Sequence, residues 1–199
     1  MAITSIKTGS SFTNLKKYND FLAGNEAYNP PMFESIATLT AAGGETSLTF
    51  SSIPATYQHL QVRWIARSSG YAEYIFGRAN ATGGYANHSL AGNGSSASAA
   101  GATSNTYIEM QGGVSQSTST ASTFGAGILD IIDYASTTKN KTFRYFVGYN
   151  TNGSTDQRVQ LGSALGTGIT TAAISSLDFR VDTGTFAAGS TFALYGIRG

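Results

Sequence analysis

Hydrophobic and polar side chains alternate cleanly along residues 59–67, HLQVRWIAR. In an extended chain the two sets point to opposite sides. The apolar set is Leu60, Val62, Trp64 and Ala66, and the polar set is Gln61, Arg63 and Arg67. This pattern predicts a half-buried strand of an antiparallel sheet, with one face on a core.

Similar short segments recur along the rest of the chain, separated by turns rich in glycine. They cover residues 34–40, 47–53, 72–78, 106–111, 123–134, 142–149, 157–161, 174–181 and 191–197. About ten strands at short spacing, with no helical segment between them, are typical of two packed antiparallel sheets. The predicted fold class is therefore all-β, an antiparallel β-sandwich of jelly-roll-like form over residues 33–199.

The connections between these segments carry further expectations. Residues 34–40 and 47–53 flank the sequence AAGGE, which predicts that they form a β-hairpin. Residues 92–104 and 112–122 consist largely of Gly, Ala, Ser, Thr and Asn. Such segments carry little apolar area to offset the entropy of ordering them, so both are predicted to be long surface loops.

Residues 1–32 follow a different pattern. Apolar positions recur every three to four residues over 11–24, with Gly24 as a C-cap, which predicts one short helix. A helix of about twelve residues is marginal alone, so its apolar stripe must rest on another surface. The following Asn29-Pro30-Pro31 forms a stiff spacer. We expect this arm either to fold back onto its own domain or to dock onto another protein or a second copy.

Composition narrows the classes of function. Charged residues make up 12% of the chain, about half the usual share of about 25%, with 12 Lys and Arg against 11 Asp and Glu. The basic residues are scattered singly except for Lys16 and Lys17, so no cationic face for nucleic acid is expected. Ser and Thr together number 49 and replace the missing charge with hydroxyls.

Targeting and redox signals are sparse. The opening MAITSIKTGS has no cationic region followed by an apolar run, so no secretory signal is expected. No apolar stretch approaches the about 20 residues that a membrane span needs, and membrane insertion is not expected. The chain has no Cys, so we expect a fold without disulfide bonds.

Candidate catalytic and metal-binding groups are few. The two histidines, His59 and His88, are expected to be ordinary surface or loop residues, and without Cys they argue against a zinc or redox-metal site. Pairs of acids such as Asp130 with Asp133 could contribute to a calcium site, but no calcium-loop spacing is present. The nucleophile-elbow and phosphate-loop motifs are also absent. The sequence therefore predicts a protein without catalytic residues or cofactor.

Aromatic residues gather in a polar setting over residues 71–88, next to Asn80 and Asn87. Aromatic rings beside amides line many shallow sugar sites and anchor many protein interfaces, although rings in a β-sandwich more often fill the core. The residues that we consider as a receptor-facing loop are Tyr71, Tyr85, Asn87 and His88.

Several sequence blocks resemble virion proteins of tailed bacteriophages, notably of cyanophages and other marine phages. The blocks are SIKTGS at 5–10, FESIATLT at 33–40, FSSIPATYQHLQVR at 50–63, YANHSLAGNGS at 85–95, IDYASTTKNKT at 132–142 and FAAGSTFALYGI at 186–197. The last is the most specific. The resemblance spans most of the chain, but its motifs are structural, and no catalytic residue can be carried over.

The resemblance implies a particle component with a β-rich knob, built as a homotrimer and located in the virion. Residues 1–32 would dock into other virion proteins of the tail, adaptor or capsid, with Phe12, Leu15, Phe21 and Leu22 as anchors. Exposed loops of residues 33–199 would then meet host surface glycans. The leading expectation is a non-enzymatic short tail fibre or tail-attached knob; the alternatives are a capsid decoration (cement or head-fibre) protein with the same fold and, less favoured, a glycan-degrading tail enzyme.

Overall fold

The computed structural model describes residues 32–151 and 157–199, and these residues form strands and no helix. The strands are β1 (Phe33–Thr40), β2 (Ser47–Phe50), β3 (His59–Ala66), β4 (Tyr74–Ala79), β5 (Tyr85–Gly92), β6 (Ala97–Asn105), β7 (Ile108–Gln111), β8 (Gly125–Ile132), β9 (Lys141–Tyr149), β10 (Arg158–Gly166), β11 (Leu177–Val181) and β12 (Thr191–Ile197). The predicted all-β class is confirmed.

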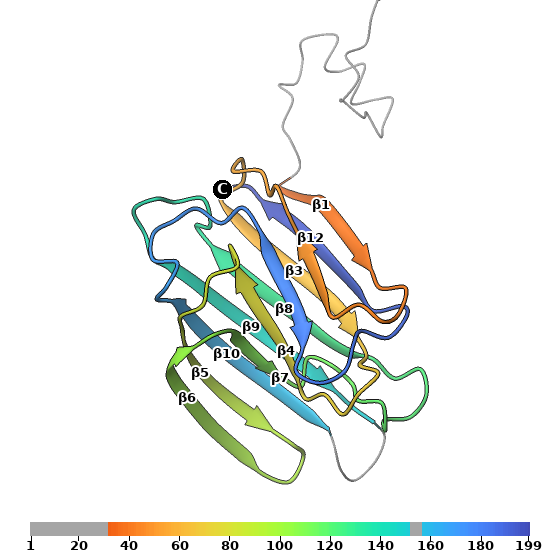
Figure 1. Cartoon of the computed structure of the whole chain (residues 1–199). Helices are drawn as coiled ribbons and strands as arrows, with labels where there is room; N and C mark the ends of the chain where they lie inside the picture. The colour runs from red at the N-terminus through yellow and green to blue at the C-terminus, as the bar shows by residue number, and fades with distance from the viewer. Residues whose placement is uncertain (1–31, 152–156) are drawn as a thin grey trace, which may run out of the picture. The chain divides into compact units, whose positions relative to one another are not determined.

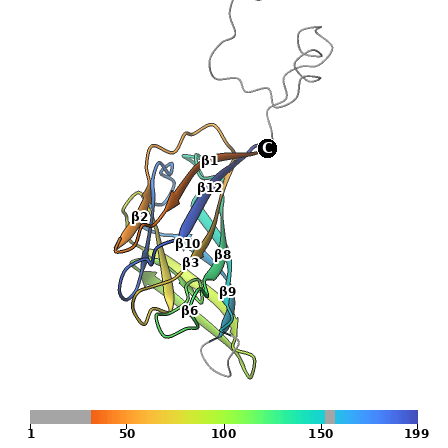
Figure 2. The same cartoon turned by 90° about the vertical axis from the view of Figure 1, so that its right-hand side faces the viewer.

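Two antiparallel sheets of unequal width pack against each other (Figures 1 and 2). The larger has eight strands in the order β1-β12-β3-β8-β9-β10-β5-β6, and the smaller has four in the order β2-β11-β4-β7. The predicted β-sandwich is therefore confirmed. Because the smaller sheet has half as many strands, it covers only part of the inner face of the larger one.

The core lies between the sheets and follows the alternation read from the sequence. The apolar set of β3 is buried, and Trp64 stacks on Phe192 of β12 at 5.7 Å between ring centroids. Phe179 of the smaller sheet closes the cluster, with its ring centroid 5.1 Å from that of Phe192. Opposite Trp64, β8 carries Gly127, where a Cβ would lie 2.1 Å from the indole. Only glycine leaves room for the indole ring at that register.

Two predicted local features are wrong. The segments 34–40 and 47–53 do not form a hairpin, because β1 pairs with β12 in the larger sheet and β2 pairs with β11 in the smaller one. Most of the predicted loop 92–104 is strand, because residues 97–105 form β6, which pairs with β5. An edge strand needs backbone pairing on one side only, so small residues suffice where a neighbour supplies the hydrogen bonds.

The other predicted surface loop, at 112–122, forms no named strand, but only residues 117–122 lie at the surface, since 112–116 are buried. Arg67 orders the surface part. The Arg67 guanidinium donates to four backbone carbonyls, those of Ser117, Ser119, Thr120 and Thr123, at 2.9 to 3.1 Å. One charged side chain thereby supplies the partners that the loop's own sequence lacks.

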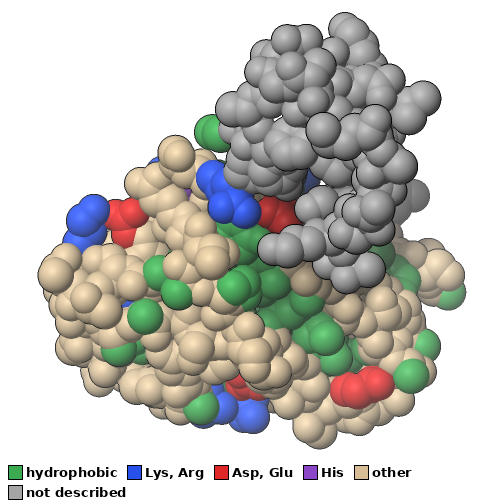
Figure 3. All heavy atoms as spheres, turned by 90° about the horizontal axis from the view of Figure 1, so that it is seen from above, with side chains coloured by type: hydrophobic (Ala, Val, Ile, Leu, Met, Phe, Trp, Pro, Cys, Tyr) green, Lys and Arg blue, Asp and Glu red, His purple; other side chains and the backbone are tan. Residues whose placement is uncertain are grey.

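Charge is sparse on the visible surface. In the view from above (Figure 3), Lys, Arg, Asp and Glu stand in small separate groups, some of them beside a patch of hydrophobic side chains. The predicted helix over 11–24 and the predicted anchors Phe12, Leu15, Phe21 and Leu22 lie outside the described residues.

Candidate functional site

The four residues considered as a receptor-facing loop do not share one surface. Tyr85, Asn87 and His88 lie on strand β5, so the loop prediction is wrong for them. Tyr85 is fully buried, its hydroxyl accepts from the backbone N–H of Ala79 at 2.8 Å, and burial raises its pKa to about 12. Asn87 also faces inward, His88 faces outward on the opposite side of the sheet, and Tyr71 is exposed before β4. The alternation of β5 separates what proximity in sequence suggested.

The histidine and acidic candidates have structural contacts. His59 Nδ1 accepts from the backbone N–H of Asp133 at 3.0 Å. Lys139 donates to the Asp133 carboxylate, and this hydrogen bond holds the pKa of Asp133 below its usual value. Asp130 accepts from Gln61 at 2.8 Å. Within residues 32–151 and 157–199, no three His, Cys, Asp or Glu side chains cluster so as to hold a metal ion.

The outer face of the larger sheet carries a continuous line of apolar side chains. Strand register places Ile128 of β8 opposite Phe146 of β9, Phe146 opposite Leu161 of β10, and Leu161 opposite Leu90 of β5. Ala99 of β6 pairs with Leu90 and extends the line. We call these five residues the outer apolar row. Phe146, Leu161 and Leu90 are 57%, 55% and 61% exposed, so they are no part of the core.

The neighbouring positions extend this apolar surface on one side and end it on the other. On one side lie Ile65 and Val159, which are also about half exposed. On the other side register aligns Asp130, Arg144, Ser163 and His88. A shallow hollow of about 410 Å³ lies between Leu90 and Leu161, with Arg144 and Ser163 at its border. Exposed apolar surface that is continuous across several strands and bordered by polar groups is typical of interaction sites.

The two edges of the larger sheet differ. Strand β1 has a register shift between Ser35 and Ala37 and carries Glu34, which pairs with Arg198 at 3.1 Å. Strand β6, with the sequence ASAAGATSN, contains no charged residue and no proline. Bulges and charges are the usual protection of an edge strand against pairing with another chain. Strand β6 lacks both along residues 97–102, so its outer edge is open to such pairing.

A polar groove runs along the edge of the smaller sheet at β7. There the smaller sheet ends, and β5 and β6 of the larger sheet continue beyond it (Figure 1). The groove has a volume of about 120 Å³. We call it the β7 groove; its polar and aromatic lining comes from Tyr74, Asn87, Ser89, Asn105, Glu109, Gln111, Tyr145 and Gln160.

Hydrogen bonds fix several side chains of the β7 groove. The Gln160 side chain accepts from the backbone N–H of Gln111 at 2.8 Å and donates to the Ser89 hydroxyl at 3.1 Å. The Gln111 amide donates to the Glu73 carboxylate at 2.7 Å and accepts from Arg158. The Tyr145 hydroxyl donates to the carbonyl of Glu109 at 3.0 Å, and burial raises the pKa of Tyr145 to about 12.

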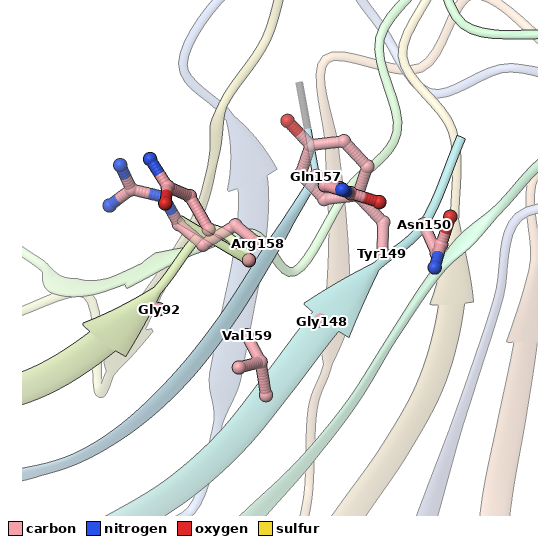
Figure 4. A pocket seen from close by; sticks show the side chains of 9 residues that line it. Gly92, Gly148, Tyr149, Asn150, Gln157, Arg158 and Val159 are labelled. Atoms are coloured by element: carbon pink, nitrogen blue, oxygen red, sulfur yellow. The ribbon is translucent and has the colours of Figure 1, made fainter. Parts of the chain in front are cut away.

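Arg158 and Gln111 continue the groove toward the ends of β9 and β10, where a second hollow of about 150 Å³ also includes Glu73 and Gln157. A wider pocket of about 490 Å³ opens beside it (Figure 4). In this view Arg158 and Val159 project to opposite sides of β10, and Gln157 lies beside Tyr149. Arg158 thus belongs to the inner face and Val159 to the outer one.

Sequence reasoning missed both surfaces, though a signal for each was present. In β10 the residues Val159, Leu161 and Leu165 alternate with Gln160, Gly162 and Ala164, and the large apolar residues are the outward ones. For the groove, Asn87, Ser89 and Gln160 are polar residues at inward positions, which predicts a wet region between the sheets.

The described residues contain no helix of the length and hydrophobicity that would cross a membrane. No protein-family model, curated protein or solved structure matches this chain.

Proposed function

We propose that this chain is a non-enzymatic structural protein of a tailed-phage virion, a short tail fibre or tail-attached knob, whose outer apolar row packs against a second copy of the same chain. The phage assignment draws its support from the sequence blocks described above. The block at 186–197 contains β12, which joins β1 to β3 within the larger sheet. The outer apolar row is the observation that carries the assembly role.

A second copy suits this face because the face is apolar and nearly neutral. On the outward positions of β8, β9, β10, β5 and β6, the charged side chains are Asp130 and Arg144, which cancel, and Arg63 of β3 adds one positive charge beside Ile128 at the end of the row. Two such faces can approach with little net repulsion, whereas a polyanion would find no cationic cluster to bind. The row ends at β6, so the open edge and the apolar face form one continuous surface for neighbouring subunits.

The oligomeric state in solution tests this role. Light scattering after size-exclusion chromatography should show an oligomer across the micromolar range for the full chain. The double variant Phe146→Ser with Leu161→Ser should weaken self-association at least about 100-fold, because it removes the central side chains of the interface. Thr142→Ser, on the same face of β9 outside the row, is the matched control and should associate like the unchanged chain. A chain that is monomeric throughout this range would overturn the assembly role.

Particle experiments test the virion assignment separately. Imaging of intact particles with this protein labelled should place it on the tail. Removal of residues 1–32 should abolish incorporation, and full occupancy by the truncated chain would contradict docking through that segment. A copy number that follows the capsid lattice would contradict the tail location and favour decoration of the capsid.

A further inference from the structure

Strand β6 is the last strand at one end of the larger sheet, and one side of its backbone is open (Figure 1). Strand β5 pairs with it on the other side. Residues 97–101 are exposed on both faces, and no described strand lies along the open side. The N–H and C=O groups that point to this side therefore have no protein partner among residues 32–151 and 157–199.

The turn between β5 and β6 shows which backbone groups these are. The N–H of Asn93 donates to the carbonyl of Ser96 at 3.2 Å, so these two residues form a hydrogen-bonded pair. In an antiparallel ladder, hydrogen-bonded pairs alternate with pairs whose N–H and C=O groups point away from each other. Counting from the turn, every second residue of β6 bonds to β5, and the residues between direct their groups to the open side. These open residues are Ala97, Ala99 and Gly101.

The side chains at the open positions leave the backbone accessible. Ala97 and Ala99 carry only methyl groups. At Gly101 a Cβ would lie 2.8 Å from Cδ2 of His88, so the imidazole occupies the space of a side chain there. The register with β5 is regular from Ala97 to Ala102 and shifts only beyond that point. Another strand can therefore pair with β6 along this length.

The three open residues are self-complementary under a two-fold axis. When a second β6 lies antiparallel with its Ala99 opposite Ala99, Ala97 of each copy lies opposite Gly101 of the other. Each of these pairs exchanges both N–H and C=O, which makes about six hydrogen bonds. A shift of the pairing toward the turn or toward the irregular end of β6 leaves some of the open groups without partners.

The surroundings of the open edge also favour a second copy. Strand β6 contains no charged residue, so two copies approach without repulsion. Ala99 is the last residue of the outer apolar row, so this pairing would align the rows of the two copies. At the other end of the larger sheet, the register shift of β1 and the charge of Glu34 protect the edge. Pairing through β6 therefore stops at two chains.

We propose that β6 pairs antiparallel with β6 of a second copy, with Ala99 opposite Ala99, so that the larger sheets of two chains form one continuous sheet. The inference rests on the proposed assembly role for its partner, but it uses the backbone of the edge, whereas the outer apolar row uses side chains of the face. A two-fold contact gives assemblies with an even number of chains, unlike the trimer that the resemblance implies. Each backbone bond replaces a bond to water, so this contact is weak alone and is best detected by covalent trapping.

Disulfide trapping of the full chain tests this register, because the chain has no Cys of its own. Ala99→Cys places two thiols on residues about 5.5 Å apart between Cα atoms, within the range that a disulfide spans. Ala97→Cys is the matched control, because it is an equivalent open position whose two copies stand about 13 Å apart along the strands in this register. Under mild oxidation, Ala99→Cys should form the linked dimer at least about tenfold faster than Ala97→Cys on non-reducing gels.

Two combined variants separate the edge contact from the outer apolar row. In the Phe146→Ser, Leu161→Ser background, Ala99→Cys should still be trapped faster than Ala97→Cys, because the edge groups are unchanged. Adding Ala97→Pro to Ala99→Cys should slow trapping about tenfold, since proline removes an N–H that faces the open side and none that bonds to β5. Circular dichroism checks that each variant retains the fold.

The proposal is overturned if Ala99→Cys is trapped no faster than Ala97→Cys. It is also overturned if the Phe146→Ser, Leu161→Ser background removes the difference, because the thiols would then have met through the face of the sheet. The assembly role of the outer apolar row fails separately, when light scattering shows that this background associates like the unchanged chain.

Discussion

The outer faces of the two sheets contrast with each other. On the smaller sheet, Arg78 pairs with Asp178 at 3.2 Å, and Arg180 donates to the Tyr107 hydroxyl at 2.9 Å. Both guanidinium groups lie over the Tyr107 ring, at 5.5 and 5.3 Å from its centroid. On the larger sheet, the corresponding face presents the outer apolar row, in which Phe146, Leu161 and Leu90 are more than half exposed.

This contrast shows how a chain with few charges distributes them. The smaller sheet uses its charges and aromatic rings in contacts with each other, although Nε of Arg78 and Nε of Arg180 have no hydrogen-bond partner among the described residues. The outer apolar row has only solvent beside it among the described residues, and solvent is the less favourable neighbour for apolar groups. The exposed apolar side chains of the larger sheet are the basis on which a second copy is proposed to pack on that face.

The largest expected effect comes from comparing two phenylalanines at different depths. Phe192→Ala should lower the free energy of unfolding by about 3 to 5 kcal/mol, because Phe192 is fully buried among Trp64, Phe179 and Phe186. Phe146→Ala should change the stability of the monomer by no more than about 0.5 kcal/mol. Urea denaturation followed by circular dichroism at low protein concentration measures both. A large loss for Phe146→Ala would place the outer apolar row in the core and remove the contrast.

An intermediate effect is expected on the smaller sheet. Asp178→Asn should cost about 1 to 2 kcal/mol, because the carboxylate accepts from Arg78 at 3.2 Å and from Thr49 at 3.2 Å in a largely buried position. A double-mutant cycle with Arg78→Gln should give a coupling of about 1 kcal/mol that weakens with added salt. If the cycle gives no coupling, Arg78 and Asp178 do not stabilise each other, and the contrast between the outer faces of the two sheets is lost.

The smallest effect should have the opposite sign. The folded-state pKa of Glu109 is raised by desolvation above its ordinary value of 4.5, so the folded chain binds more protons than the unfolded chain as pH passes through the window between the two pKa values. Stability is therefore lost as pH rises through that window. Glu109→Gln should stabilise the chain at neutral pH by less than about 1 kcal/mol, and the gain should vanish below pH 4.5. Urea denaturation at neutral pH and below pH 4.5 measures the change in the free energy of unfolding. If Glu109→Gln destabilises the chain at neutral pH, the Glu109 carboxylate has a partner.

The all-β class and most strands could be predicted from the alternation of apolar and polar residues. In a strand with one buried face, every second side chain is buried, whichever strands lie beside it. Strand order itself depends on contacts that are distant in sequence. The β1 and β2 segments look like a hairpin locally, yet Phe33 pairs with Ile197 and Phe50 with Leu177. Strand β6 escaped prediction because its residues are small and exposed on both faces, so no alternation marks it.

The candidate sites were harder to predict than the fold. Tyr85 and His88 are near each other in sequence, but the odd spacing places them on opposite faces of β5. Lys141 is fully buried, and its ammonium donates to the carbonyls of Asp133, Ser136 and Lys139. Burial lowers its pKa. No pattern in the sequence distinguishes such a lysine from an exposed one, because its partners are backbone groups of a turn.

The single Trp of the chain gives this fold a built-in optical reporter. Trp64 is 4% exposed, and its indole N–H donates to the carbonyl of Gly113 at 2.8 Å. Its fluorescence emission should therefore lie at short wavelength in the folded chain and move to longer wavelength only when the two layers separate. Because the indole lies on the inner side of the larger sheet, ligands and neighbours that act on the outer surface should leave its spectrum unchanged.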